Sequence, residues 1–401
     1  MNRTSRILMF ATLVNTFGNG AYLTTSALLL TRYVGLTVGQ VAVGLSAGAL
    51  VGMVLSTPMG YVVDRLGPKR IYVAALLASA VCYAGLARVE GVWGFAAIAC
   101  LIAVGDATAK AANGALIAAA VPPAERVRTR AYWRSTNNAG IALGTLAGGI
   151  PLALDSRAGY LVVLVGNAAS FLIAAVLVGR IERPAVVPAP VGGPRMVALR
   201  DRPFMGFALV DGLAAALYNE MVSLALPLWL VRYTHAPVAL VSAALLVNTI
   251  GCVTLQVWAS RGTATAADAI PVGRRGALVV AGACVLFGLT EHRASWLVGA
   301  LVVLAALVHL LGELWLSTAT SAVVFGLAPD WAQGQYQAAQ QTGRQIGNLA
   351  APPLLIALVI GLGAPGWLGL ALIFAAVAWA GPALVRRGLR LRRPELSDAL
   401  A

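Results

Sequence analysis

The stretch GYVVDRLGPKR, residues 60–70, interrupts a chain that is otherwise strongly apolar. It places an acid, three bases, two glycines and a proline within eleven residues. Elsewhere charge is scarce, because 59% of the 401 residues are apolar and only 11% are charged. A soluble protein of this length would need far more charge to cover its surface. The composition therefore predicts a chain that lies mostly in a lipid bilayer, with residues 60–70 in a polar loop.

Twelve apolar segments, bounded by charged or turn residues, make up most of the chain. About 20 apolar residues in a helix cross the roughly 30 Å core of a bilayer, and a helix satisfies its own backbone polar groups there. The alternating pattern of a membrane β-barrel is missing from the sequence. We therefore expect an all-α membrane protein with spans at residues 7–31, 38–62, 71–88, 92–119, 130–154, 158–180, 203–231, 237–260, 276–290, 294–327, 333–361 and 364–385.

The distribution of basic residues predicts the orientation of these spans. With an even number of spans both termini lie on one side, where the loops hold 22 Lys and Arg. The loops of the opposite side hold only Arg32, Arg88, Arg157, Arg232 and Arg293. The positive-inside rule therefore places both termini in the cytoplasm. The same distribution explains the net charge of +14 without nucleic acid as a partner.

A proline- and glycine-rich stretch divides the chain into two halves of six spans each. The expected parts are an N-terminal six-helix bundle at 1–181, a cytoplasmic linker at 182–202, a C-terminal six-helix bundle at 203–390 and a cytoplasmic tail at 391–401. The halves also repeat weakly, since an offset of 204 residues places Asp64 on Asp268. An offset of 203 residues places Gly140, Gly144 and Gly148 on Gly343, Gly347 and Ala351. Such repeats are typical of secondary transporters built from two pseudo-symmetric bundles.

The loop at residues 60–70 resembles the signature loop of the major facilitator superfamily, G-x-x-x-D-R-x-G-x-K-R, which joins the second and third spans. The matching residues are Gly60, Asp64, Arg65, Gly67, Lys69 and Arg70. The resemblance implies the major facilitator fold, with two bundles that alternate access to a central site. It also implies that Asp64 meets the start of span 11, near residues 331–335, where a helix N-terminus favours negative charge. Such a contact would hold the cytoplasmic side shut.

Two further stretches carry the same resemblance. KAANG, residues 110–114, resembles the family's R-x-x-Q-G, with Lys for Arg and Asn for Gln. GIALGTLAGG, residues 140–149, resembles the G-x-x-x-G-P-x-x-G-G of its antiporters, with Thr145 where the family has proline. The matching glycines are Gly140, Gly144, Gly148 and Gly149. Glycines four apart also permit close helix packing, which is all that we expect of Gly44, Gly48 and Gly52.

Ionisable side chains inside the spans are few, and such residues are functional by default. In the family that this chain resembles, spans 1, 4, 7 and 10 line the central cavity, and most of these side chains fall on them. The expected substrate and proton cavity comprises Asn15, Asn19, Asp106, Lys110, Glu220, His309, Glu313 and Arg344.

The spacing of these residues suggests their roles. Asp106 and Lys110 are four residues apart and could form an ion pair, which is as well supported as a cavity role. His309 and Glu313 share that spacing, and a carboxylate beside a histidine is suited to proton exchange. In span 7, Glu220 is the preferred proton carrier because it lies at mid-depth.

Span 7 also carries Asp211, nine residues before Glu220 and so on the opposite face of a helix. We expect Asp211 to serve the cytoplasmic gate or to pair with a basic neighbour. Span 11 begins with a polar stripe that packing against the signature loop explains as well as substrate contact does. The stripe consists of Gln337, Gln341, Arg344 and Asn348.

We expect neither disulfides nor a metal site. The four cysteines lie in apolar segments without a CxxC pair and are interpreted as core residues; they are Cys82, Cys100, Cys252 and Cys284. A Walker A sequence is missing, so the proton gradient is the expected energy source, with no cofactor. The protein is not expected to be an enzyme.

The expected function is proton-coupled efflux of a small lipophilic compound, such as a drug or secondary metabolite. One alternative is proton-coupled uptake of a sugar, an amino acid or an organic acid, although a sugar site would need more hydrogen-bonding side chains. Another is a membrane sensor or scaffold. The expected partners are the small-molecule substrate, protons and the lipid of a bacterial inner membrane, in which the protein is a monomer.

Overall fold

The computed structural model describes residues 3–185, 187–190 and 195–398. Within these residues helices are the regular secondary structure and no strand is present. Nine helical segments of the described chain are long and apolar enough to cross a membrane. Each of the twelve expected spans coincides with one helix or with consecutive helical pieces.

The N-terminal half contains spans 1 to 6. Span 1 ends in a π-helical turn, η1, and the other spans are single helices. Its elements are α1 (Arg3–Leu28), η1 (Leu29–Tyr33), α2 (Val38–Leu66), α3 (Pro68–Leu86), α4 (Gly91–Ala120), α5 (Pro123–Leu154) and α6 (Arg157–Gly179).

The C-terminal half contains spans 7 to 12. Span 7 is α8, η2 and α9; span 8 is α10 and α11; span 11 is η3, α14 and η4. The elements are α7 (Val197–Arg200), α8 (Arg202–Glu220), η2 (Met221–Ala225), α9 (Leu226–Tyr233), α10 (Ala239–Thr254), α11 (Gln256–Ala259), α12 (Ala266–Gly288), α13 (Ser295–Leu327), η3 (Asp330–Ala332), α14 (Gln333–Leu355), η4 (Ile356–Ile360) and α15 (Ala364–Asp398).

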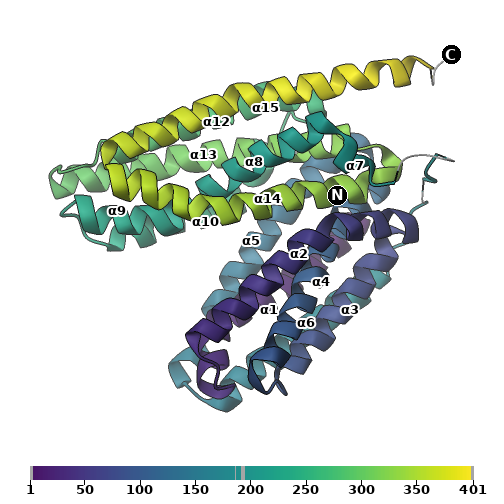
Figure 1. Ribbon diagram of the computed structural model, residues 1–401, viewed down its shortest axis with the longest axis horizontal. Helices are drawn as coiled ribbons and strands as arrows, with labels where there is room; N and C mark the ends of the chain where they lie inside the picture. Colours follow the sequence, from purple (N-terminus) through teal and green to yellow (C-terminus); the bar gives the residue numbers. More distant parts are fainter. Residues whose placement is uncertain (1–2, 186, 191–194, 399–401) are drawn as a thin grey trace. The chain divides into compact units, whose positions relative to one another are not determined.

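The described chain forms two compact units (Figure 1). Unit 1 comprises Met1–Pro123, Tyr132–Val197 and Pro329–Gln341. Unit 2 comprises Ala124–Ala131, Ala198–Ala328 and Thr342–Ala401. Residues 124–131 of α5 therefore belong to unit 2, whereas residues 132–154 of the same helix belong to unit 1. Conversely, residues 333–341 of α14 belong to unit 1 and residues 342–355 to unit 2.

The predicted linker and tail lie partly outside the described residues. In the linker these are residues 186 and 191–194, and α7 occupies its last part. In the tail, α15 continues as helix to Asp398, and only residues 399–401 lie outside the description.

The largest differences from the expected starts are in α5, which begins at Pro123 rather than 130, and in α12, which begins at Ala266 rather than 276. At the start of α12, Thr265 and Asp268 form a capping box in which the Asp268 backbone N–H donates to Thr265 Oγ1 (3.2 Å). Caps of this kind allow polar first turns to be helical. Asp268 thus caps the start of a helix, whereas Asp64 lies at the end of α2, so the offset of 204 does not pair equivalent positions.

A pair of close helix crossings made by glycines, one in each unit, is related by the offset of 203 residues. In unit 1, a Cβ atom at Gly144 of α5 would overlap the carbonyl oxygen of Phe17 in α1. In unit 2, a Cβ atom at Gly347 of α14 would overlap the carbonyl oxygen of Gly212 in α8. The offset of 203 residues therefore relates helices that pack in the same way, with backbone against backbone. Gly149, the last glycine of the antiporter-like stretch, has open space at its Cβ position and takes no part.

The glycines of α2 serve packing, as expected. A Cβ atom at Gly44 would overlap the Phe95 ring of α4, and one at Gly48 would lie 2.9 Å from the Ala99 carbonyl oxygen. The core of unit 2 contains an aromatic cluster, in which Trp229, Phe287 and Trp367 are fully buried. The Phe287 and Trp367 rings stack with centroids 5.1 Å apart.

Span 7 is interrupted directly after Glu220. Here the Leu226 backbone N–H bonds to the Met221 carbonyl oxygen, five residues back, which is the π-helical spacing. A π-helical turn holds one residue more than an α-helical turn and often occurs at functional sites. The break therefore coincides with the acid that the sequence singles out in this span.

Candidate functional site

The polar loop expected at residues 60–70 is reduced to Gly67, because α2 continues to Leu66 and α3 begins at Pro68. Asp64 therefore lies in the last turn of α2, and it meets the first turn of α14. Its carboxylate accepts hydrogen bonds from the backbone N–H groups of Gly334 (2.6 Å) and Gln335 (3.0 Å). The first N–H groups of a helix have no partner within it and carry partial positive charge. An anion therefore satisfies them, and the contact predicted for residues 331–335 is present.

Small residues allow α2 and α14 to approach closely enough for this contact. A Cβ atom at Gly60 would lie 2.6 Å from both the Ala338 Cβ atom and the Gly334 carbonyl oxygen. One helical turn earlier, Ser56 Oγ donates to the Ala338 carbonyl oxygen (3.1 Å). Gly60 and Asp64 are thus parts of a single helix contact.

The other residues of the signature loop act locally. Gly67 joins α2 to α3 with φ = 93°, in the region that favours glycine. Lys69 donates through Nζ to the Ile181 carbonyl oxygen just beyond α6, where helix carbonyls attract positive charge. The Arg65 guanidinium lies over the Tyr61 ring, and Arg70 is exposed.

A cavity of about 410 Å³ lies within unit 1 among α1, α2, α3, α4 and α6. Asn19 and Asp106 share its wall, so the structure brings these two predicted residues together. The remainder of the wall is aromatic, aliphatic or small, with Ser79 as the one further polar side chain besides the tyrosines. It consists of Tyr22, Leu23, Leu45, Gly48, Ala49, Ser79, Tyr83, Leu86, Phe95, Ala99, Ile102, Ala103 and Phe171.

The charge in this cavity is balanced. Asp106 Oδ2 lies 2.7 Å from Lys110 Nζ, the two side chains are 57% and 42% exposed, and Asp106 is the member of the pair that lines the cavity. On α1, Asn19 Nδ2 donates to Asn15 Oδ1 at 3.4 Å. The predicted residues of unit 1 therefore form two polar pairs, Asp106–Lys110 and Asn15–Asn19. Asp106 and Asn19 are the members that line the cavity.

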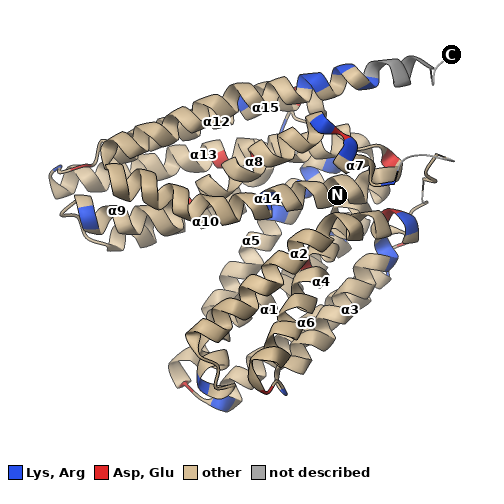
Figure 2. Ribbon diagram, viewed as in Figure 1, with Lys and Arg blue, Asp and Glu red and all other residues tan. Residues whose placement is uncertain are grey.

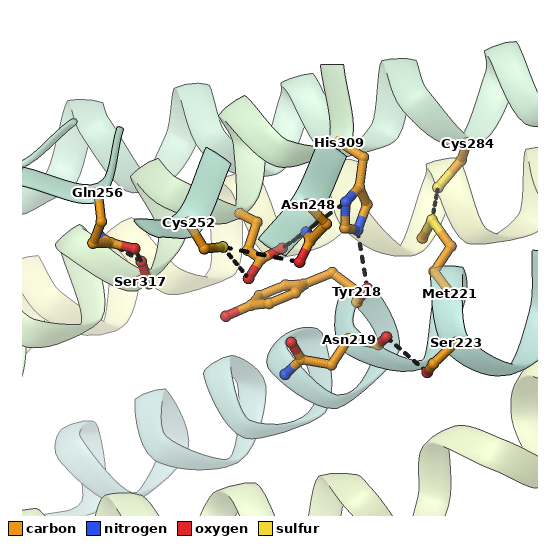
Figure 3. A network of polar contacts seen from close by, with 11 residues as sticks. Tyr218, Asn219, Met221, Ser223, Asn248, Cys252, Gln256, Cys284, His309 and Ser317 are labelled. Carbon is orange, nitrogen blue, oxygen red and sulfur yellow. Dashed lines mark hydrogen bonds and ion pairs between the residues drawn. The ribbon is translucent and has the colours of Figure 1, made fainter. Parts of the chain in front are cut away.

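Unit 2 contains a buried polar network in which Asn248, Cys252 and His309, labelled in Figure 3, all contact Glu313. Only 3% of Glu313 is exposed. Asn248 Nδ2 donates to Glu313 Oε2 (2.6 Å), and the Cys252 thiol donates to Glu313 Oε1 (3.5 Å). His309 Nδ1 lies 4.0 Å from Glu313 Oε2. The predicted pair on span 10 is therefore supported by two residues of span 8.

The other nitrogen of His309 fixes the state of the ring. Nε2 lies 2.9 Å from the Tyr218 carbonyl oxygen in α8. A carbonyl oxygen only accepts hydrogen bonds, so the proton of a neutral ring is on Nε2. Nδ1 then turns a lone pair toward the Glu313 carboxylate. The two groups together have room for one more proton, on either Nδ1 or the carboxylate.

Two members of this network, Asn248 and Cys252, were not among the predicted site residues. Span 8 contains no charged residue, so the pattern of intramembrane charges does not point to it. Cys252 is buried as expected, but it contacts a carboxylate and is more than apolar core. The signal in the sequence was the spacing of four residues between Asn248 and Cys252, which puts both on one face of α10.

The remaining predicted residues of unit 2 lie apart from Glu313. Glu220 is partly exposed and accepts a hydrogen bond from Ser223 Oγ (3.0 Å) within its own span. Asp211, in the middle of α8, accepts a hydrogen bond from Thr320 Oγ1 of α13. Arg344 of α14 is partly buried, and its Nε has no hydrogen-bond partner among the described residues.

Comparison with known protein families identifies one family. The sequence profile of the Major Facilitator Superfamily matches residues 8–352. A comparison with curated protein sequences gives no match.

Solved structures of transporters share this fold. A bacterial homologue of the iron transporter ferroportin, in an outward-facing state, aligns with a TM-score of 0.73 at 14% identity, over 97% of this chain and 100% of that chain. The E. coli fucose:proton symporter aligns with a TM-score of 0.70 at 14% identity, over 96% and 98%. The human organic anion transporter MFSD10 aligns with a TM-score of 0.67 at 13% identity, over 95% and 100%. At these identities the likeness concerns the fold.

Proposed function

The chain belongs to the major facilitator superfamily, and we propose that it exports a small lipophilic compound in exchange for protons. The family and the structural neighbours are membrane transporters and not enzymes. The chain is accordingly a multi-pass transporter of small molecules. Its substrate, the direction of transport and the coupling ion are the subject of the proposal.

The observation that carries the proposal is the wall of the unit 1 cavity. Rings and aliphatic side chains form most of it, and Tyr83 contacts both Tyr22 and Phe171 with ring centroids 5.0 and 5.2 Å away. Such a wall suits an apolar ligand oriented by a few polar groups. A sugar would leave most of its hydroxyl groups without partners, at a cost for each of them. Asp106, the one acid in the wall, is paired with Lys110 and so presents no unbalanced charge.

The buried network of unit 2 supplies a group that can carry the proton. With one proton shared between Glu313 and His309, the pair is neutral and fits its buried position. Without it, the carboxylate is charged and relies on Asn248 and Cys252, in a place where charge is costly. We infer that protonation of this pair favours one state of the transport cycle and its loss the other. Glu313 therefore replaces Glu220 as the preferred carrier.

The contact of Asp64 with α14 fits a gate. Asp64 and Gly60 lie on α2 in the first half of the chain, and α14 belongs to the second half. A rocking motion of the halves would break the two hydrogen bonds from Gly334 and Gln335. We infer that this contact holds the cytoplasmic side closed during part of each cycle.

Transport into everted membrane vesicles with an acidic lumen tests the proposal. We expect a lipophilic compound to accumulate while the lumen becomes alkaline, because protons leave as the compound enters. Glu313→Gln should abolish coupled transport. Glu291→Gln is the matched control, because Glu291 accepts a hydrogen bond from the Ala364 backbone N–H (3.4 Å) outside the network.

Three outcomes would contradict the proposal. Solute and protons moving in the same direction, with a sugar, amino acid or organic acid as the solute, would make the protein an uptake symporter. Coupled transport that survives Glu313→Gln would move the proton site elsewhere. Purified protein that moves no compound in liposomes would indicate a sensor or scaffold.

A further inference from the structure

A second cavity of unit 1, of about 300 Å³, lies at the end of α3 opposite to the signature loop. It is formed where α3 ends and where α4 and α6 begin, beside η1. Arg88 and Arg157 line it, and both are exposed. Its floor contains Leu29, Leu86 and Leu164, which are buried. The cavity thus combines two guanidinium groups with an apolar base.

The two arginines have no acidic partner among the described residues of the protein. In the part of the chain that the structure describes, neither Arg88 nor Arg157 forms an ion pair. Arg32, on the same side of the membrane by the expected topology, is different because it pairs with Asp155. The carboxylate of Asp155 also accepts a hydrogen bond from Tyr160 Oη (2.9 Å). Glu90 is the one acid in the cavity wall, so the wall has a net positive charge.

The position of the cavity makes this charge unexpected. Only five basic residues are predicted in the loops on the non-cytoplasmic side, and two of them line one cavity. Unpaired arginines are disfavoured in such loops by the positive-inside rule. Because three spans begin or end here, the arginines lie at the level of the lipid head groups. An anion at that level would compensate both of them.

We propose that this cavity binds the phosphodiester head group of an anionic phospholipid, with Arg88 and Arg157 holding the phosphate and the leucines holding the first carbons of the acyl chains. Guanidinium groups match phosphate oxygens in geometry and charge. A volume of about 300 Å³ is at the lower limit of small-molecule sites and exceeds what one inorganic phosphate needs. The lipid would tie together α3, α4 and α6 at one end of unit 1.

Thermal unfolding of the purified full chain with added short-chain lipids tests the site. We expect dihexanoyl phosphatidylglycerol to raise the unfolding temperature more than dihexanoyl phosphatidylcholine does. The double variant Arg88→Gln/Arg157→Gln should need at least about tenfold more phosphatidylglycerol for the same shift, because it loses the charge-assisted hydrogen bonds of both guanidinium groups. Arg293→Gln, which removes an arginine of the same side of the membrane outside this cavity, should respond like the natural protein.

Further measurements show whether the bound ligand is a lipid or a soluble phosphate. Native mass spectrometry should show phosphatidylglycerol retained by the natural protein and by Arg293→Gln, and lost from the double variant. Equal shifts with inorganic phosphate or glycerol phosphate would overturn the lipid assignment. Equal shifts with the two lipids, or an unchanged response of the double variant, would overturn the site itself.

Discussion

Both carboxylate oxygens of Asp64 are engaged by backbone N–H groups at the start of α14. An asparagine would offer one oxygen and would turn an NH₂ group toward the second N–H donor. It would also remove the negative charge that the helix N-terminus favours. A hydrogen bond to a charged group is worth on the order of 1.5–3 kcal/mol, so one amide substitution should unbalance the gate.

We therefore predict that Asp64→Asn lowers the transport rate at least tenfold while the substrate still binds with nearly unchanged affinity. Flux into vesicles and equilibrium binding to the purified protein measure the two quantities separately. Glu125→Gln is the matched control, because Glu125 is an exposed acid in the first turn of α5. Normal flux in Asp64→Asn would show that the contact is packing and not a gate.

Some of the candidate site residues can be predicted from the sequence and others cannot, for a physical reason. Asp64, Asp106 and Glu313 stand out because charge in an apolar span is costly. Asn248 and Cys252 are uncharged, and only the folded chain shows that both bond to Glu313. Partners of a buried acid come from neighbouring helices, and their identity depends on how those helices are packed.

At the scale of elements, the spans were predictable because a bilayer demands long apolar helices. The polar ends of these helices are harder to predict, as the early starts of α5 and α12 show. Apolar content ends at the membrane surface, whereas a helix continues as long as its caps permit. The π-helical turns carry no sequence period and could not be predicted.

Two glycines of the antiporter-like stretch of α5 should respond differently to substitution by alanine. A methyl group at Gly144 would push against the Phe17 backbone of α1, and such overpacking costs about 1–3 kcal/mol. Gly144→Ala should therefore lower the apparent unfolding temperature. Gly149→Ala meets nothing and should leave it equal or slightly higher, because alanine favours helix by up to about 1 kcal/mol.

Differential scanning fluorimetry in detergent measures both variants. Gly347→Ala should repeat the loss in unit 2, because the Gly212 carbonyl oxygen takes the place of Phe17 there. Equal unfolding temperatures for Gly144→Ala and Gly149→Ala would show that the close crossing does not limit stability.

At the scale of the whole molecule, the small number of charges allows the number of protons exchanged per transport cycle to be predicted. Most Lys and Arg lie at the ends of helices, and few charges lie between them (Figure 2). The Glu313–His309 pair has room for one exchangeable proton, and the Asp106–Lys110 pair is neutral as a whole. One cycle should therefore exchange one proton for one substrate molecule.

This count predicts how transport responds to voltage. Export of a neutral compound should move one net charge per cycle, whereas export of a monovalent cation should move none. Currents on solid-supported membranes, or the effect of a potassium diffusion potential on flux, measure the difference. Equal currents for a neutral and a cationic substrate of similar shape would contradict a single-proton exchange.

The π-helical turn after Glu220 has a consequence for mapping span 7. One extra residue in a turn rotates everything beyond it by about 100° around the helix axis. In a scan of single-cysteine variants with a water-soluble thiol reagent, reactivity should therefore repeat every 3.6 residues up to Glu220. The pattern should shift by one residue across Met221–Ala225, and the 3.6-residue period should continue in α9. A helical wheel drawn straight through the span would assign the residues of α9 to the wrong face.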